Sequence, residues 1–118
     1  MNTRKLGTEK EDRAAAYIES HGGKVTERNF RSRMGEIDLI ARDSGTICFI
    51  EVKYRSGEAK GHPLEAVGTK KQFTICRVSD YYRMKHHLPE DIPYRFDVVS
   101  IIGNEIIWLK NAFQYISL

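Results

Sequence analysis

The sequence predicts a single domain, residues 1–118, of the α/β or α+β class, with a central mixed β-sheet flanked by α-helices. The length of 118 residues suits one domain, because folded domains most often have about 100–150 residues. Segments with apolar residues at helical spacing and segments with strand-like patterns follow one another in a definite order. That order is helix, three strands, helix, two strands, which is typical of a sheet covered by helices.

A helix is expected over residues 8–20, where Ala14, Ala15, Tyr17 and Ile18 form an apolar stripe. The pair Gly22-Gly23 follows and supplies the left-handed backbone that ends helices. A short edge strand is expected next, over Val25 to Phe30.

A β-hairpin is the next prediction. Residues 36–41 alternate in polarity, 43–45 are turn formers, and 46–54 are rich in β-branched and aromatic side chains. The polar segment 57–61 is expected to be an exposed loop.

A second helix is expected from Thr69 to about His86, with the Thr69 hydroxyl and Gln72 forming a capping box. Two further strands are predicted at residues 94–102 and 105–109, joined by a two-residue Gly103-Asn104 turn.

The composition is that of a globular protein, with 41% hydrophobic and 30% charged residues. No segment approaches the roughly 20 apolar residues of a membrane helix. Residues 1–13 lack the apolar core of a secretory signal, and Cys48 and Cys76 lie inside apolar patterns. We therefore expect a cytoplasmic protein that contacts no membrane and whose cysteines stay reduced and buried.

The basic surplus lies in the middle of the chain. Residues 28–60 hold seven bases against five acids, and residues 61–87 hold five against two. Such a strip can contact the phosphates of a nucleic acid, although in an arbitrary domain a well-solvated surface is the commoner explanation. The candidate phosphate contacts are Arg28, Arg31, Arg33, Arg55, Lys70 and Lys71.

Two strands of the predicted hairpin bring acidic and basic side chains together. Because side chains alternate along a strand, Glu51 and Lys53 point to one face, and pairing brings Asp38 beside Glu51. Two converging carboxylates favour a bound Mg²⁺ or Mn²⁺, and Lys53 can stabilise charge on a phosphate. Glu11 adds a third carboxylate if the first helix crosses the sheet. An ion pair without catalytic role remains the alternative.

The sequence resembles the YraN-like family of predicted endonucleases, distant relatives of archaeal Holliday junction resolvases. The resemblance covers residues 7–113 and includes 11–17, 28–29, 35–41, 49–55, 65–67, 71–72, 95–99 and 111–113. It implies a restriction-endonuclease-like fold with a metal site at the edge of the sheet.

The resemblance also implies roles for single residues. Asp38, Glu51 and Lys53 match the aspartate, acid and lysine of the PD-(D/E)xK nuclease motif, and Ile37 stands where the motif has proline. Glu11 resembles the first-helix acid of the resolvases, although Lys10 replaces a glycine often found before it, and Gln72 resembles a polar residue on the following helix.

The leading hypothesis is therefore a Mg²⁺- or Mn²⁺-dependent endonuclease that hydrolyses phosphodiester bonds in structured, branched DNA. Its metal ligands are Asp38, Glu51 and Glu11, with Lys53 and Gln72 completing the catalytic set. The alternative is a non-catalytic nucleic-acid-binding module with the same fold. A homodimer is expected, because a four-way junction presents paired strands to two sites.

Overall fold

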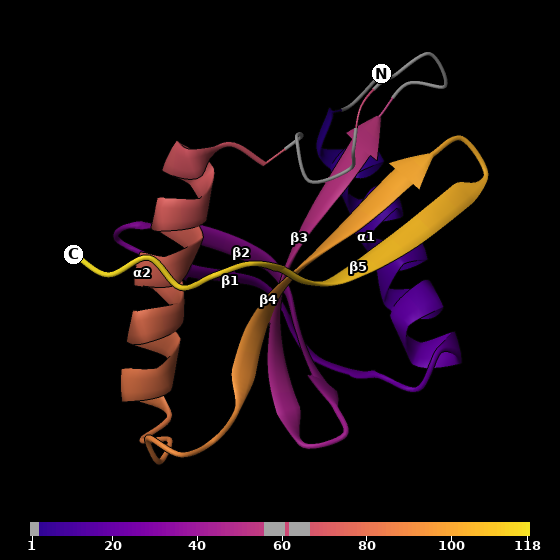
Figure 1. Ribbon diagram of the computed structural model, residues 1–118. Helices are drawn as coiled ribbons and strands as arrows, with labels where there is room; N and C mark the ends of the chain where they lie inside the picture. The colour runs from indigo at the N-terminus through magenta and orange to yellow at the C-terminus, as the bar shows by residue number, and fades with distance from the viewer. Residues whose placement is uncertain (1–2, 56–60, 62–66) are drawn as a thin grey trace.

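A computed structural model describes residues 3–55, 61 and 67–118. The element order is the predicted one, and Figure 1 labels each helix and strand. The elements are α1 (Thr3–Ser20), β1 (Lys24–Ser32), β2 (Gly35–Asp43), β3 (Thr46–Arg55), α2 (Thr69–Lys85), β4 (Tyr94–Ile102) and β5 (Glu105–Phe113).

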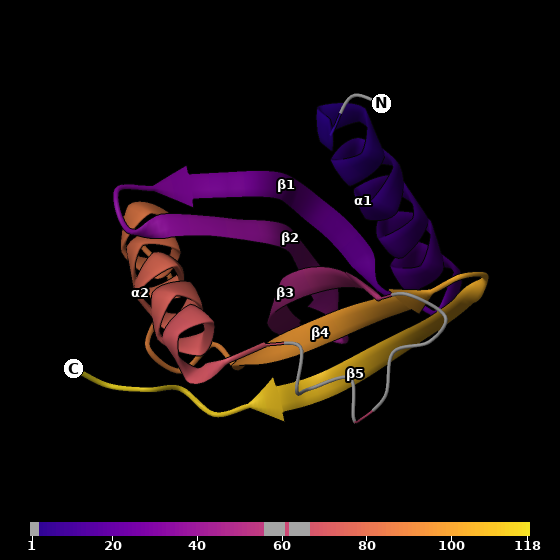
Figure 2. The same cartoon turned by 90° about the horizontal axis from the view of Figure 1, so that it is seen from above.

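The five strands form one mixed sheet in the order β1-β2-β3-β4-β5. Strands β3 and β4 are parallel, and the other neighbours are antiparallel. Two parallel neighbours need a long crossover connection, and α2 lies within it. Figure 2 shows α1 and α2 on opposite sides of the sheet. The predicted α+β fold with a mixed sheet is confirmed.

Each helix encloses its own apolar core. On one face, Phe49 and Phe96 of the sheet pack with Ile75, Val78 and Tyr82 of α2. On the other face, α1 packs on β2, β3 and β4, and the residues of this cluster are Ala14, Ala15, Ile18, Leu39, Ala41, Cys48, Ile50, Val99 and Ile101. No helix in the described residues combines the length and apolarity that crossing a membrane requires.

The turns take the predicted positions. Ser44 and Gly45 both have positive φ (50° and 87°), as a two-residue type I′ hairpin turn requires. Gly22 ends α1 with φ 94°. Gly23 is required for a different reason: a Cβ there would lie 2.6 Å from Ile18 Cγ2. The close approach of β1 to α1 therefore depends on the missing side chain.

The predicted capping box of α2 is wrong. Gly68 is the N-cap, in extended backbone and without a side-chain cap hydrogen bond. Thr69 already lies inside the first helical turn, so its hydroxyl is not at the capping position. Gln72 Nε2 instead donates to the Val67 carbonyl at 3.0 Å.

Several element ends also differ from the predicted bounds. Helix α1 begins at Thr3, β1 covers Lys24–Ser32, and α2 ends one residue earlier than expected, with His86 as its C-cap. Strand β5 continues to Phe113 because Phe113 pairs with Phe96 beyond an irregularity in the ladder. The predicted loop 57–61 lies outside the described residues except for Gly61.

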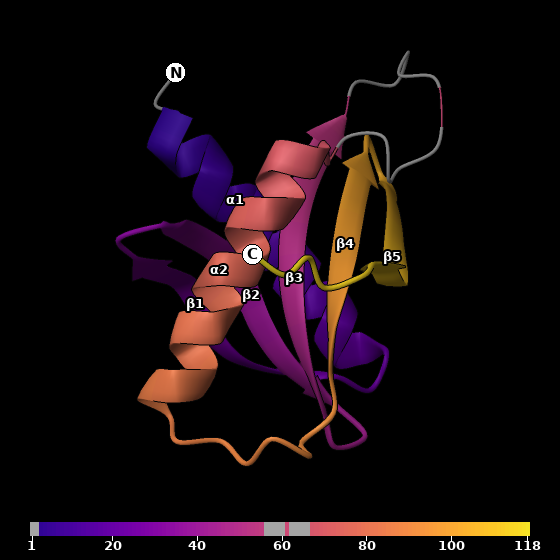
Figure 3. The same ribbon diagram turned by 60° about the vertical axis from the view of Figure 1, so that its left-hand side comes forward.

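The chain end packs along α2, as Figure 3 shows. Arg77 Nη2 donates to the Ile116 carbonyl at 2.5 Å, and the Ile116 amide donates to Cys76 Sγ at 3.4 Å. The Tyr115 hydroxyl donates to Asp80 at 3.0 Å. This segment therefore packs against both α2 and the sheet, because the Tyr115 ring also lies against Tyr94 and Phe96 of β4.

A buried carboxylate joins β4 to β5. Asp97 is fully buried and accepts hydrogen bonds from Arg95 Nε at 2.9 Å, Trp108 Nε1 at 3.0 Å and the Asn111 amide at 2.8 Å. The ladder between β4 and β5 is irregular between Phe96 and Val98, and the Asp97 side chain supplies the acceptor that the ladder lacks there. Asp97 is thus a structural hydrogen-bond acceptor, as its sequence position suggests.

Asp97→Ala is expected to lower the free energy of unfolding by about 3–5 kcal/mol, because it removes the fully buried acceptor that the partly buried donors of Arg95, Trp108 and Asn111 share. Urea unfolding measures the change. The control is the exposed Asp91→Ala, which should change stability by less than about 0.5 kcal/mol. Equal stability of the two variants would contradict the structural role of Asp97.

Candidate metal and active site

Strands β2 and β3 stop pairing at one point, and Asp38 lies just past it. Leu39 and Ile50 form the pair at that end of the ladder, and continued pairing would place Asp38 opposite Glu51. Instead, the Val52 amide donates to Asp38 Oδ2 at 2.8 Å. A side-chain acceptor thus replaces a backbone acceptor, and the two strands separate from this point (Figure 2).

The carboxyl groups of Asp38 and Glu51 converge there, as the hairpin pattern predicts. The pKa of Asp38 is raised from 3.8 to about 8, first by burial and then by the hydrogen bond and the charge of the neighbouring Glu51. The Val52 amide and the charge of Lys71 act in the opposite direction. The first acid of the pair therefore tends to hold a proton at neutral pH.

Glu51 is the more buried member of the pair. Its side chain is 6% exposed, and Lys71 Nζ of α2 lies 3.5 Å from its Oε2. That oxygen is buried and accepts no hydrogen bond from the part of the chain that the structure describes. It is therefore a carboxylate oxygen with unused acceptor capacity.

Helix α1 brings Glu11 to the same place. Carboxylate oxygens of Glu11, Glu36 and Asp38 lie within 4.8 Å of one another. Burial raises the pKa of Glu11, a hydrogen bond from Asn29 lowers it, and the charges of Asp38 and Glu36 raise it again. The expected approach of Glu11 to Asp38 is thus confirmed, and Asp38 is the residue that both Glu51 and Glu11 adjoin.

Glu36 is the member of this cluster that the sequence reasoning missed. The signal was present, because residues 36 and 38 are two apart on a strand and strand side chains alternate. Its ion pair with Arg31 at 2.7 Å also brings one of the candidate phosphate-binding residues to the cluster.

Asn29 holds Glu11 in place through an unusual backbone. Its φ is 52°, a left-handed conformation that asparagine tolerates better than most residues. Its Nδ2 donates to Glu11 Oε2 at 2.9 Å. A backbone outlier next to an acidic cluster is the kind of strain that functional sites retain.

Lys53 and Gln72, the other two predicted catalytic residues, lie in different surroundings. Lys53 is half-buried on β3 beside Ser100 of β4, two residues after Glu51, and makes no ion pair within the described ranges. The Gln72 amide instead contacts Val67 in the connection before α2. The catalytic role of Gln72 stays a prediction. In the structure its side chain makes a contact that stabilises the start of α2.

The candidate phosphate contacts are in varied surroundings. Arg28 pairs with Asp12, Arg31 pairs with Glu36, and Arg55 Nη1 donates to the Gly61 carbonyl at 3.4 Å. Arg33 and Lys70 are exposed. Lys71 differs from them all, because its ammonium faces Glu51.

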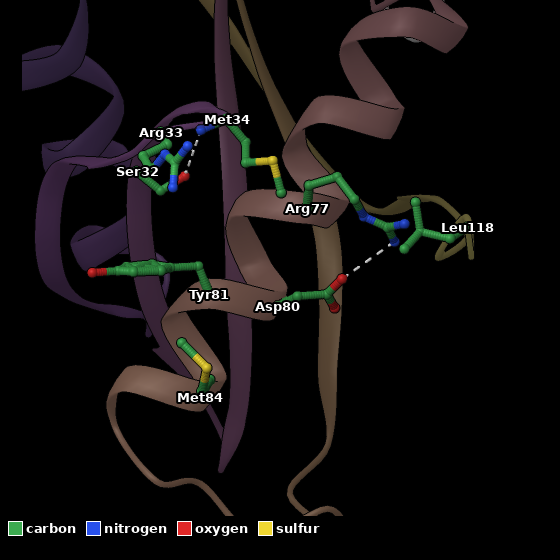
Figure 4. Close-up of a pocket in the computed structure, with 8 residues that line it drawn as sticks. All are labelled: Ser32, Arg33, Met34, Arg77, Asp80, Tyr81, Met84 and Leu118. Carbon is green, nitrogen blue, oxygen red and sulfur yellow. Dashed lines mark hydrogen bonds and ion pairs between the residues drawn. The ribbon is translucent and has the colours of Figure 1, made fainter.

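A cavity of about 710 Å³ lies apart from these acids, between the β1–β2 turn and α2 (Figure 4). Its lining includes the exposed Met34 and Met84 and the ion-paired Arg77 and Asp80. None of the clustered acids lines it. The cavity therefore does not belong to the candidate metal site.

The cysteines are not candidate nucleophiles. Both are buried, and burial raises the pKa of Cys48 to about 12 and also raises that of Cys76. A thiol with a raised pKa is a weak nucleophile at neutral pH, because little thiolate is present.

Comparison with known proteins shows which family this chain is similar to. The model of "Uncharacterised protein family UPF0102" matches residues 10–101. A UPF0102 protein of Lachnoclostridium phytofermentans is 45% identical over 114 residues, which are 97% of each chain. One of Persephonella marina is 42% identical over 108 residues, or 92% of each chain. UPF0102 protein FN1370 of Fusobacterium nucleatum is 40% identical over 111 residues, covering 94% of this chain and 92% of the relative.

The matched segment contains Glu11, Asp38, Glu51, Lys53 and Lys71. The matches to the relatives extend over nearly the whole chain, as the resemblance to YraN-like proteins implied. The protein belongs to the UPF0102, or YraN-like, family.

Proposed function

We propose that this protein is a metal-dependent endonuclease of the PD-(D/E)xK type that hydrolyses phosphodiester bonds in structured DNA. The observation that supports it most is the convergence of half-buried Asp38 and buried Glu51 where β2 and β3 separate. A second negative charge beside Glu51 would be repelled, and this repulsion contributes to the raised pKa of Asp38. A divalent cation between them would relieve that repulsion.

The donor atoms fit Mg²⁺ or Mn²⁺. Glu11, Glu36, Asp38 and Glu51 all offer carboxylate oxygens, the hard ligands that these ions prefer. Glu51 Oε2 is buried and has no hydrogen bond within the described residues, so it is available for coordination. Glu36 and Asp38 of β2 and Glu51 of β3 would hold the ion from the sheet, and Glu11 would hold it from α1.

In this proposal the ion supplies Lewis acidity to a phosphodiester oxygen and makes water more acidic. The side chains of the protein hold the ion and stabilise charge on the phosphate. Asp38 and Glu51 would hold the ion in place. Lys53, on the same strand as Glu51, places an ammonium where negative charge develops on the phosphate. Asp38 and Glu51-Val52-Lys53 are then the motif residues, with Ile37 in place of the motif's proline.

The surrounding charges suit a nucleic acid. Arg33 and Lys70 are exposed, and Arg28 and Arg31 can exchange their carboxylate partners for phosphates. Affinity for DNA should accordingly fall steeply with salt. The homodimer that a two-fold DNA junction would need stays a prediction, which light scattering tests.

Incubation with Mg²⁺ or Mn²⁺ should produce cleavage of branched DNA, and Asp38→Ala and Glu51→Gln should each lower the rate at least about 100-fold, because each removes a carboxylate that holds the ion. Chelation should abolish the activity. Gel assays on branched, flapped and linear DNA measure it. The control Glu19→Gln changes an exposed acid of α1 and should leave the rate unaltered.

Absence of cleavage on every substrate, or equal cleavage by Asp38→Ala, would contradict the nuclease proposal. DNA binding that is salt-sensitive but unchanged by Glu51→Gln and by chelator would indicate the non-catalytic module instead.

Asp38→Asn is expected to stabilise the metal-free protein at alkaline pH but not at pH 5. The pKa of Asp38 is raised from 3.8 to about 8, so between these values the native state holds a proton that the unfolded chain has lost. The contribution of Asp38 to the free energy of unfolding therefore falls as pH rises through this window. Asparagine does not titrate, so its stability advantage should grow by about 2 kcal/mol or more from pH 5 to pH 9.

Urea unfolding in chelator at both pH values measures this difference. Asp43→Asn is the matched control of opposite sign, because hydrogen bonds from Arg95 and Lys110 lower the pKa of Asp43. Its stabilising contribution is present above the unfolded pKa and is lost as pH falls, so that variant should be less stable than wild type at pH 9. A stability difference for Asp38→Asn that is independent of pH would refute the raised pKa.

A further inference from the structure

Helix α2 begins with two adjacent lysines in different surroundings. Lys70 is exposed, whereas Lys71 is half-buried and lies one helical turn before Ile75. Ile75, Val78 and Tyr82 continue that stripe and pack against the sheet. Helical periodicity would place an apolar residue at 71, yet this position holds an ammonium that faces Glu51.

The position is unfavourable for a lysine unless something compensates it. The amino end of a helix carries partial positive charge, and the first turn of α2 contains no acidic residue. Glu51 provides the compensating negative charge from β3, through the ion pair with Lys71. The ion pair therefore links the start of α2 to the acidic centre of the candidate site.

This ion pair is loose. Its 3.5 Å separation exceeds the roughly 2.7–2.9 Å of a charge-assisted hydrogen bond, and Glu51 Oε2 accepts no hydrogen bond in the described chain. The Lys71 side chain is 42% exposed, whereas that of Glu51 is 6% exposed. The lysine is thus free to move into solvent, and the buried carboxylate is not.

We propose that Lys71 is the internal counter-ion of Glu51 in the metal-free protein and competes with the divalent cation for this carboxylate. The proposal rests on the proposed function, because it concerns the cation of that site. When Lys71 withdraws from Glu51, its ammonium stays at the amino end of α2, where helix and side chain together favour an anion. Lys71 therefore controls metal affinity and then adds a positive charge beside the substrate phosphate.

Titration calorimetry with Mg²⁺ at pH 9 tests the competition directly, without DNA. The proteins compared are the wild type, Lys71→Met, Lys71→Arg and Lys70→Met. Loss of the competing charge should tighten Mg²⁺ binding about five-fold in Lys71→Met. Lys71→Arg keeps the charge and Lys70→Met changes a lysine that does not contact Glu51, so both should stay within about two-fold of wild type.

Thermal unfolding adds a readout that a merely structural role would not produce. In chelator, Lys71→Met should melt below wild type, because buried Glu51 has lost its counter-ion. Saturating Mg²⁺ should raise the melting temperature of Lys71→Met more than that of wild type, since the cation replaces the ammonium.

Equal or weaker Mg²⁺ binding by Lys71→Met, with binding retained in wild type, would overturn the competition and leave the proposed function intact. Absence of Mg²⁺ binding in all four proteins would overturn both the competition and the proposed nuclease.

Discussion

The candidate site depends on one hydrogen bond, from the Val52 amide to the Asp38 carboxylate. Inside a sheet, an amide normally donates to a neighbouring backbone carbonyl, and β2 and β3 stay together as long as this pattern continues. Because a side chain takes over as acceptor, the strands can separate while the Val52 amide remains satisfied. The separation lets Glu51 from β3 and Glu11 from α1 approach Asp38, so a local exchange of acceptors creates the acidic centre.

Two aspartates of this sheet, fully buried Asp97 and half-buried Asp38, show that such a centre lowers stability. Asp97 is surrounded by donors from Arg95, Trp108 and Asn111, and it joins β4 to β5. Asp38 has one amide donor in the described residues, and its side-chain hydrogen-bond partner is another acid, Glu51. The same functional group is thus stabilising at one position and strained at the other. Proteins keep such unsatisfied acids mainly where a ligand or a reaction requires them.

The sequence patterns predicted the presence and order of the helices and strands better than the residues at which they begin and end. The hairpin of β2 and β3 followed from alternation and turn residues, and the convergence of Asp38 and Glu51 followed from that hairpin. The predicted capping box at Thr69 was wrong because only the residue with the non-helical backbone at the start of the helix can act as the N-cap. That residue is Gly68, one position earlier, and it has no side chain with which to cap. The extension of β5 depends on pairing with β4 across an irregularity, which residues 105–109 alone do not reveal.

The sequence by itself determined the order of the elements, the apolar faces and the side chains that strand alternation groups together. These properties are local, because they depend on the spacing of two or of three to four residues along the chain. Only the tertiary structure decided that Glu11 meets Glu36 and Asp38, and that Lys71 rather than Lys70 faces Glu51. Those contacts join segments far apart in the chain, and helix rotation and the separation of two strands set their distances. No local pattern encodes either quantity.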